Sequence, residues 1–352
     1  MTANIDHSAP VLVTGATGYV AGWLVKRLLE VGRTVHAAVR DPNNEEKVQH
    51  LKTLEQQSSG MLKFFKAELL QDGSYAESME GCQLVYHTAS PFTMKVSDPE
   101  QELVQPAVAG TRNVLSQAKQ TESVRRVIVT SSIVAMCGDN ADLAESNADQ
   151  LNEDAWNTTS SLDHNPYSYS KVQAEKEAWK IAETQDRWDL ITINPGLVVG
   201  PGLNPNATSE SFNLIANFGN GKMRFGVPDY GVALVDVRDV AEAHYQAGVR
   251  PEASGRYLVT AHNTNFPEIG RVLKQHFGRK YPFPPLTSPK PIVWLVGPLL
   301  DSSLTRRNIS RNVGYPMKAD NSKSRHELGI EYRSMEESLV EFFQQLIDTK
   351  AV

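Results

Sequence analysis

Two patterns of apolar and polar positions alternate along the first two thirds of the chain. Short apolar runs such as "VLVT" at 11–14 and "TVHAAV" at 34–39 are separated by stretches with the 3.6-residue period of an amphipathic helix, as over 18–31. Strands and helices that take turns at this spacing form right-handed parallel crossovers. The pattern therefore predicts an α/β protein with a doubly wound parallel sheet and helices on both faces. Further strands are expected at "MLKFFKA", "QLVYHTA", "RVIVTSS" and "DLITINP", and further helices near 44–57 and over 99–120 and 167–185.

The regular alternation ends after Gly196, where the chain continues as "VVGPGLNPNATSE". Glycine, proline and asparagine at this density mark departure from the sheet. A strand and a helix over about 233–249 and a strand at 256–260 are expected to rejoin it. The rest should form a small lobe over the carboxyl ends of the strands, where open α/β sheets hold their ligands. The predicted division is a sheet domain of residues 1–196 plus about 233–260, and a discontinuous C-terminal substrate lobe of 197–232 plus about 261–352.

Charge and targeting signals narrow the classes of partner. The 352 residues carry a formal net charge of -6 and contain no long run of like charges, so nucleic acid and anionic membranes are not expected partners. The polar N-terminus lacks a signal peptide, and the apolar run "IVWLVGPLL" is too short to span a bilayer. We expect a cytoplasmic protein, either a monomer or a homodimer.

Cysteine and histidine give no sign of a disulfide framework or a metal site. Cys82 and Cys137 are the only cysteines, and we expect both to be buried small apolar residues in a reducing compartment. The nine histidines show no ligand spacing with cysteine or carboxylate, so no metal is expected.

A glycine-rich turn follows the first predicted strand directly. In "VLVTGATGYVAGWLV", Gly15, Gly18 and Ala21 fall between that strand and the mouth of a helix. Glycines there allow a tight turn and let the backbone approach a pyrophosphate, which the positive helix end stabilises. This context predicts a Rossmann-type, dinucleotide-binding domain. The cofactor-binding residues of the turn are predicted to be Gly15, Thr17, Gly18, Tyr19 and Val20.

The residue after the second strand indicates which dinucleotide is bound. Arg40 stands where an NAD-preferring protein commonly presents a carboxylate, and its guanidinium can clamp a 2′-phosphate, with Lys47 as a second positive charge. This favours NADPH. Asp41 could instead take a ribose hydroxyl of NAD. We expect the adenine ring to lie near Glu68 and Leu69.

The segment "NPYSYSK" at 165–171 places two tyrosines close to a lysine. On a helix with about 100° per residue, Tyr167 lies about 40° from Lys171 around the axis, whereas Tyr169 lies about 200° away. Only Tyr167 can share a face with Lys171. Tyr169 is then expected to be a packing or pocket residue.

Seven segments in order resemble the extended short-chain dehydrogenase/reductase family, and within it the dihydroflavonol reductase and cinnamoyl-CoA reductase group of ketone and aldehyde reductases. They cover most of the chain: "VTGATGYVAGWLV", "VRDPNNEEKVQHL", "VYHTASPF", "VIVTSS", "YSYSKVQAEKEAW", "NPGLVVGPG" and "VDVRDVAEAH".

The resemblance implies a catalytic triad of Ser132, Tyr167 and Lys171, with Ser131 as the fallback for the serine. Lys47 fits a basic residue that family members place beside the 2′-phosphate. The resemblance also implies further contacts with the nicotinamide half of the cofactor, from Thr88, Ala89 and Ser90 on one side and from the backbone of Pro195, Gly196, Leu197 and Val198 at the carboxamide end.

Two departures from the group bear on the substrate. Dihydroflavonol reductases place an asparagine five residues after the catalytic serine, where this chain has Cys137. The cinnamoyl-CoA reductase signature "NWYCYGK" is replaced by "NPYSYSK". The chemistry of a reductase is retained, but the named plant substrates are not expected.

The three residues suit carbonyl reduction. A carbonyl that accepts hydride develops negative charge on oxygen and needs a proton, which Tyr167 can deliver. An ordinary tyrosine holds its proton too tightly near neutrality, and the Lys171 ammonium is expected to lower the pKa of Tyr167. Ser132 would hydrogen-bond the carbonyl oxygen.

The leading hypothesis is an NADPH-dependent carbonyl reductase acting on a small-molecule aldehyde or ketone. An NAD-retaining nucleotide-sugar epimerase or dehydratase and a non-catalytic NADP-binding protein remain as alternatives. The charged residues Asp236, Arg238 and Asp239 are expected to form a structural network at a helix start. A largely apolar substrate pocket is expected from Phe92, Met94, Met136, Cys137, Phe212, Phe225 and Tyr230, suited to an apolar or aromatic substrate.

Overall fold

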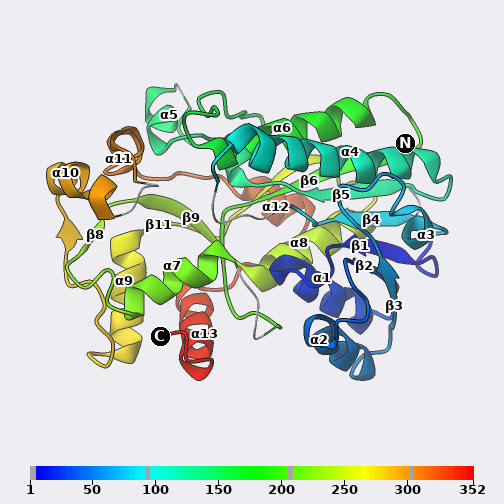
Figure 1. Ribbon diagram of the computed structural model, residues 1–352, viewed down its shortest axis with the longest axis horizontal. Coiled ribbons are helices and arrows are strands. Elements are labelled where there is room, and N and C mark those ends of the chain that lie inside the picture. The colour runs from blue at the N-terminus through cyan, green and yellow to red at the C-terminus, as the bar shows by residue number, and fades with distance from the viewer. Residues whose placement is uncertain (1–4, 92–95, 147, 205–208, 301–303) are drawn as a thin grey trace.

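A seven-stranded sheet forms the centre of the computed structural model, which describes residues 5–91, 96–146, 148–204, 209–300 and 304–352. Every neighbouring pair in the order β10-β6-β5-β4-β1-β2-β3 is parallel (Figure 1). The chain winds outward from β1 in both directions, which confirms the doubly wound sheet and places the switch point between β1 and β4. The strands are β1 (Val11–Thr14), β2 (Thr34–Val39), β3 (Met61–Lys66), β4 (Leu84–His87), β5 (Arg126–Thr130), β6 (Asp189–Pro195) and β10 (Gly255–Val259).

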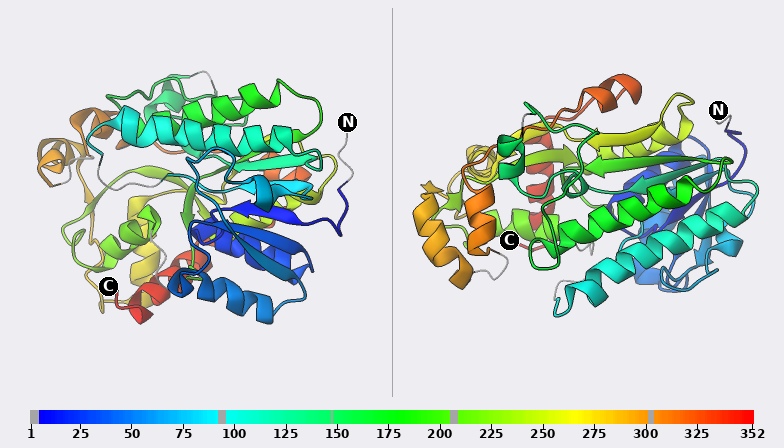
Figure 2. Two further views of the ribbon diagram at one scale, coloured as in Figure 1. Left: turned by 45° about the vertical axis from the view of Figure 1, so that its right-hand side comes forward. Right: turned by 90° about the horizontal axis from the view of Figure 1, so that it is seen from above.

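Helices cover both faces of this sheet, as the apolar pattern predicted. Strands β1 and β4 are buried along their whole length, because each face has its own apolar layer. On one face the sheet packs against α1 (Tyr19–Glu30), α2 (Glu45–Gln56) and α8 (Val237–Val249). On the other it packs against α3 (Ala76–Met79), α4 (Gln105–Gln120) and α6 (Pro166–Ala182). Helices α4 and α6 lie side by side, as the view from above in Figure 2 shows.

The remaining strands form two smaller sheets at the other end of the molecule, on the left in Figure 1. One has the order β11-β9-β7, and the other pairs β12 with β8. The strands are β7 (Leu197–Val199), β8 (Val227–Pro228), β9 (Gly231–Asp236), β11 (His262–Asn265) and β12 (Thr287–Ser288). The helices outside the two layers of the large sheet are α5 (Asn140–Glu145), α7 (Glu210–Gly219), α9 (Phe266–Phe277), α10 (Lys290–Leu300), α11 (Arg306–Asn312), α12 (Ser322–Glu327) and α13 (Met335–Asp348).

The return of the chain to the large sheet differs from the prediction in one element. Helix α8 and strand β10 do rejoin it, but β9 pairs in parallel with β7 and antiparallel with β11 in a separate sheet. The two-lobe division at about residue 233 therefore stays a prediction, and its boundary strand belongs to the smaller sheet.

Aromatic residues from α7, α9 and α13 build the core of the smaller half. Phe218, Phe342 and Phe343 are fully buried there. A Cβ on Gly219 would lie 2.3 Å from the Phe343 ring, so only glycine fits at this close approach. No helix in the described ranges is both long and apolar enough to cross a membrane.

Two smaller expectations are confirmed. Both cysteines are free and buried. Asp236 caps α8 by accepting a hydrogen bond from the backbone N–H of Arg238, and its carboxylate also pairs with the Arg238 guanidinium. Asp239 pairs with Arg333, so the charges at this helix start form a structural network.

Candidate active site

The glycine turn lies at the carboxyl end of β1, where the sequence predicted it. Gly15 has a φ of 63°, and a Cβ at this position would lie 3.0 Å from the Cα of Ala89. No described side chain caps the start of α1, whose first residue is Tyr19. A helix end of this kind leaves backbone N–H groups for an anion, which fits the pyrophosphate of a dinucleotide.

The Tyr19 side chain does not follow the turn but reaches into the smaller half of the molecule. Its hydroxyl donates to the carbonyl of Gly200 (2.5 Å), and its ring packs edge-on against Phe212 at 5.2 Å. Any contact of Tyr19 with a cofactor would therefore come from its backbone.

Hydrogen bonds join the carboxyl ends of β1 and β4. The Thr14 hydroxyl accepts from the backbone N–H of Ala89 (3.1 Å) and lies 3.0 Å from Nδ1 of buried His87. The Thr88 hydroxyl donates to the carbonyl of Thr14 (2.5 Å). The predicted nicotinamide-side residues after β4 are thus held beside the glycine turn.

Tyr167 and Lys171 share one face of α6, as helix geometry required. The Lys171 ammonium lies 5.7 Å from the centre of the Tyr167 ring and donates to the Ser90 hydroxyl at 2.9 Å. Ser90 follows β4, so the lysine joins α6 to the switch point of the sheet. A cavity beside this lysine is lined by Ser90, Leu69 and His87, among others.

Burial shifts the pKa values of both groups. Loss of water lowers the pKa of Lys171 from 10.5 to about 8. Loss of water, with a smaller effect of the Glu210 carboxylate, raises the pKa of Tyr167 to about 12, although its side chain is 48% exposed. The expected lowering of the Tyr167 pKa by Lys171 is therefore not found here, and the phenol keeps its proton at neutral pH.

The two adjacent serines after β5 have different partners. Ser131 is buried, borders the cavity beside Lys171, and donates its hydroxyl hydrogen to the buried carboxylate of Glu175. Ser132 is half-buried, and its hydroxyl accepts from the backbone N–H of Val134 (3.3 Å). The short 3₁₀ turn after Ser132 (Ile133–Ala135) packs against α6. The Ser131 hydroxyl is committed to Glu175, which favours Ser132 as the serine that faces a substrate.

Glu175 is the centre of a buried polar network below Lys171 on α6. Besides Ser131, its carboxylate accepts from Asn194 Nδ2 on β6 (2.7 Å) and from Arg256 Nε on β10 (2.6 Å). Asn194 also donates to the carbonyl of Ser132 (3.2 Å). The network ties α6 to β5, β6 and β10.

The predicted phosphate-binding cations lie at the carboxyl end of β2 and the start of α2. Arg40 and Lys47 are both exposed. The Asp41 carboxylate accepts from the backbone N–H of Asn43 (3.0 Å), an arrangement typical of a turn. Asp41 is thus engaged locally, and the geometry favours Arg40 as the group that meets the adenosine half.

The other predicted cofactor-binding residues also lie at the carboxyl edge of the large sheet. Glu68 and Leu69 follow β3, and the Leu69 carbonyl accepts from Asn113 of α4 (3.0 Å). Pro195 ends β6, and β7 begins at Leu197. These contacts stay predictions.

The described members of the predicted substrate pocket make several different contacts. Phe92 and Met94 lie outside the described residues. Phe212 packs between Tyr19 and Phe342, Phe225 is 78% exposed under Arg224, and Cys137 is buried with its thiol donating to the carbonyl of Asp139. Met136 is also buried, and Tyr230 stacks on Phe266. An apolar pocket built from this set stays a prediction.

Sequence reasoning missed three residues that hold the site: Glu175, Arg256 and His87. Glu175 could have been found, because it stands four residues after Lys171 and so shares its face of the helix. Arg256 gave no signal, because its pairing with Glu175 depends on the sheet order. Within the described ranges, no group of three or more histidine, cysteine, aspartate or glutamate residues could hold a metal ion.

Comparison with known proteins places the chain in a family. The model of the NAD dependent epimerase/dehydratase family matches residues 11–259. Cinnamoyl-CoA reductase CAD2 of Medicago truncatula is 36% identical over 343 residues, which are 97% of this chain and 96% of that one. Anthocyanidin reductase of Arabidopsis thaliana is 36% identical over 291 residues, or 79% of this chain and 84% of that one.

A solved structure agrees with this placement. Gre2 from Candida albicans, in complex with NADPH, matches with a TM-score of 0.76 and 28% identity, covering 97% of this chain and 99% of that one. The chain therefore belongs to the NAD dependent epimerase/dehydratase family, the extended short-chain dehydrogenases/reductases that its motifs resemble.

Proposed function

We propose that this chain reduces an aldehyde or ketone to an alcohol with NADPH, and that Tyr167 supplies the proton. The chain is an NADP-dependent oxidoreductase acting on carbonyl and CH–OH groups. Relatives named as reductases and a neighbour in complex with NADPH support this activity. The names of the curated relatives refer to aromatic compounds, which supports an apolar or aromatic carbonyl as the substrate class.

The residues present fit a dinucleotide. The Gly15 turn brings backbone close to Ala89 without a side chain in the way, and the start of α1 is free of a described capping side chain. Arg40 is exposed where a 2′-phosphate would need a cation. When bound, NADPH supplies the hydride, and the protein aims the reaction.

The observation that carries the proposal is the placement of Lys171 between Ser90 and Tyr167. From this position its ammonium can hold the ribose side of the cofactor and stabilise negative charge on the phenol oxygen. With a pKa of about 8, Lys171 is largely protonated at pH 7. Burial raises the pKa of Tyr167 to about 12, so the phenol carries its proton at pH 7. Donation of that proton then depends on the Lys171 ammonium, which stabilises the phenolate that remains. The Ser132 hydroxyl donates a hydrogen bond to the carbonyl oxygen as charge develops.

The direct test is NADPH oxidation with a panel of aldehydes, ketones and sugar nucleotides. Turnover with a carbonyl supports the proposal. Conversion of a sugar nucleotide without net NADPH oxidation would support an epimerase or dehydratase instead. NADPH binding without any turnover would indicate a non-catalytic binding protein.

Two tyrosine variants test the proton donor. Tyr167→Phe should keep NADPH affinity and lower kcat by about 10²- to 10⁴-fold, because no proton is delivered to the alkoxide. Tyr169→Phe, two residues along the same helix, is the matched control and should lose far less activity, because Tyr169 lies on another face of the helix. A Tyr167→Phe enzyme with the wild-type rate would refute the assignment.

A further inference from the structure

Asn165, directly before the helix of Tyr167 and Lys171, has a left-handed backbone, with φ 55° and ψ 57°. Among the described residues other than glycine, only Lys350 also has a positive φ. Asparagine adopts this region more readily than most residues with a Cβ, because its short polar side chain can form local hydrogen bonds that favour it. Tyr167 stands two residues further on. The groups that hold Asn165 therefore act on the first turn of the helix that carries Tyr167.

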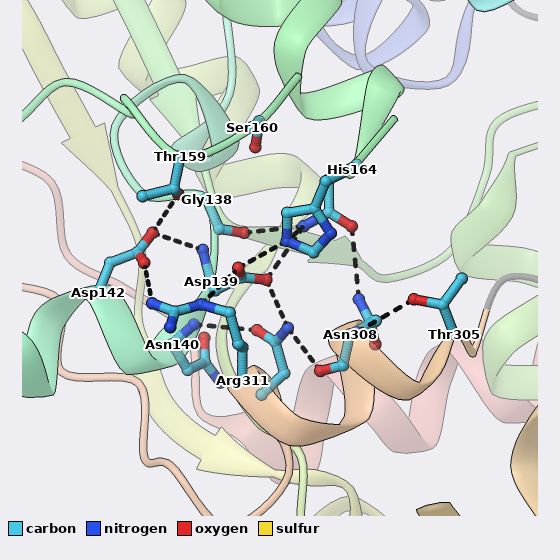
Figure 3. A network of polar contacts seen from close by, with 12 residues as sticks. Gly138, Asp139, Asn140, Asp142, Thr159, Ser160, His164, Thr305, Asn308 and Arg311 are labelled. Carbon is cyan, nitrogen blue, oxygen red and sulfur yellow. Dashed lines mark hydrogen bonds and ion pairs between the residues drawn. The ribbon is translucent and has the colours of Figure 1, made fainter. Parts of the chain in front are cut away.

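The Asp139 carboxylate helps to hold Asn165, whose side chain also donates to the Gly138 carbonyl (3.4 Å) and accepts from Asn308 Nδ2 (3.5 Å). Asn165 Nδ2 donates to Asp139 Oδ1 at 3.1 Å. The same carboxylate is almost fully buried and accepts from His164 Nε2 (2.7 Å), Arg311 Nε (3.0 Å) and Asn312 Nδ2 (2.7 Å), as Figure 3 shows for His164 and Arg311. Burial alone would raise the pKa of Asp139, but these donors hold it below its usual value. Asp139 is thus a buried carboxylate with a full set of partners.

Three segments distant in sequence meet at Asp139. It ends the loop that begins at Ser132 and stands at the N-cap of α5, where its backbone N–H donates to Asp142 (2.9 Å). Asn165 comes from the start of α6, and Arg311 comes from α11. The loop of the candidate serine and the helix of the candidate tyrosine are therefore joined through one carboxylate.

Arg311 connects this carboxylate to the last part of the chain. Its guanidinium bonds Asp139 on the inner side and pairs with Asp142 (2.6 Å) further out, as Figure 3 shows. It also pairs with Glu145 (2.9 Å). Glu145 is 60% exposed, whereas the Asp139 side chain is fully buried. The inner pair can position other residues, and the outer pair mainly orients the arginine.

We propose that Asp139 is a positioning residue for carbonyl reduction: together with Arg311 it fixes Asn165, and through Asn165 it fixes the Tyr167 phenol relative to Ser132. This inference rests on the proposed function, because it assigns Asp139 to the alignment of that proton donor. Asp139 needs no contact with substrate or cofactor for this role.

The first experiment compares two isosteric variants at partners of the same arginine. Asp139→Asn removes part of the acceptor capacity and should lower kcat by about tenfold or more, because small misplacements of a reacting group are costly. The dissociation constant of NADPH should stay unchanged, since the glycine turn and Arg40 lie elsewhere. Glu145→Gln, the matched control, should keep the wild-type kcat. An unchanged kcat in folded Asp139→Asn, a loss confined to NADPH affinity, or an equal loss in Glu145→Gln would overturn the proposal.

A second set of variants decides the matter if Asp139→Asn fails to fold. Arg311→Met keeps most of the side-chain volume at a partly exposed site and should also lower kcat, with partial recovery in Arg311→Lys. The double variant Asp139→Asn with Arg311→Met should have a kcat no lower than that of Asp139→Asn alone, because both changes act through the same contact between Asp139 and Asn165. A wild-type kcat in Arg311→Met would overturn the proposal.

The two proposals can fail separately. If the wild-type protein reduces carbonyls and the Asp139 and Arg311 variants do so equally well, only this inference is lost. If the wild-type protein reduces none, the proposed function is lost, and crystal structures of Asp139→Asn or Arg311→Met then test the positioning directly. A displaced Tyr167 with Asn165 outside the left-handed region would support it, and an unmoved pair would overturn it.

Discussion

Ser131 donates its hydroxyl hydrogen to Glu175, and both side chains are buried beneath the helix that carries Lys171. The adjacent Ser132 caps a short turn and remains half-buried. Two neighbouring residues of the same type therefore have different partners: Ser131 joins the end of β5 to α6, and Ser132 is the serine that we propose to meet a substrate.

Substitution of each serine should separate stability from catalysis. Ser132→Ala should lower kcat by about 10²- to 10³-fold, because a hydrogen bond to the developing oxyanion is lost. Ser131→Ala should mainly lower the free energy of unfolding, by about 1–3 kcal/mol, because Glu175 loses a buried donor. Steady-state kinetics and urea denaturation measure the two effects. A reversed outcome, with the rate loss in Ser131→Ala, would exchange the two roles.

Removal of the Glu175 charge should destabilise the fold. Glu175→Gln leaves the buried Arg256 guanidinium without its carboxylate and should lower the free energy of unfolding by about 3–5 kcal/mol. Glu177→Gln is a matched control two residues away, because its partner Arg112 is 57% exposed, and it should cost about 1 kcal/mol or less. Denaturant titrations measure both free energies of unfolding. Equal losses in the two variants would mean that the buried pair contributes no more to stability than the exposed pair.

Lys171 should weaken the fold at neutral pH. Burial lowers its pKa from 10.5 to about 8, so below pH 8 the native state carries an ammonium that it disfavours. Lys171→Met should therefore raise the free energy of unfolding at pH 7 by up to about 3 kcal/mol while impairing turnover.

The pH dependence of this difference gives a sharper test. Between about pH 8 and 10.5 the unfolded state binds more protons at Lys171 than the native state does, so wild-type stability rises with pH. The advantage of Lys171→Met should shrink over this range. Lys180→Met, at a 74% exposed position of the same helix, is the control variant. Urea denaturation at pH 7 and pH 10 measures both, and a pH-independent difference would contradict the lowered pKa.

Arg40 should determine the choice of cofactor. Arg40→Ala should raise the KM for NADPH by about 10- to 100-fold, because a charge-assisted contact with the 2′-phosphate is lost. The KM for NADH should not change. Lys52→Ala, on the adjacent helix and paired with Glu45, serves as the control. Equal changes for the two cofactors would place the phosphate contact elsewhere.

Features that depend on local geometry could be predicted from the sequence. The helix period alone put Tyr167 and Lys171 on one face, and the strand–glycine–helix order located Gly15 at the sheet edge. Both follow from a few neighbouring residues, so no knowledge of distant pairing was needed.

Features that depend on pairing between distant segments could not be predicted from the sequence. Strand β9 pairs with β7 and β11 and not with the large sheet. Its apolar pattern could not predict this, because the pattern suits either sheet. Phe225 is aromatic, as a pocket residue often is, but it lies on the surface. The raised pKa of Tyr167 depends on its burial and on the Glu210 carboxylate, which is distant in sequence. Neither the exposure of Phe225 nor the pKa of Tyr167 can be inferred from the neighbouring residues in the sequence.

We expect the pairing of Glu175 with Arg256 to constrain the order of folding during synthesis as well. Arg256 follows Glu175 by 81 positions, so a growing polypeptide that has left the ribosome only as far as α8 already contains both serines, the tyrosine and the lysine. It still lacks the guanidinium that neutralises the carboxylate beneath them. We therefore expect α6 to take its final position only after β10, the last strand of the large sheet, has emerged from the ribosome.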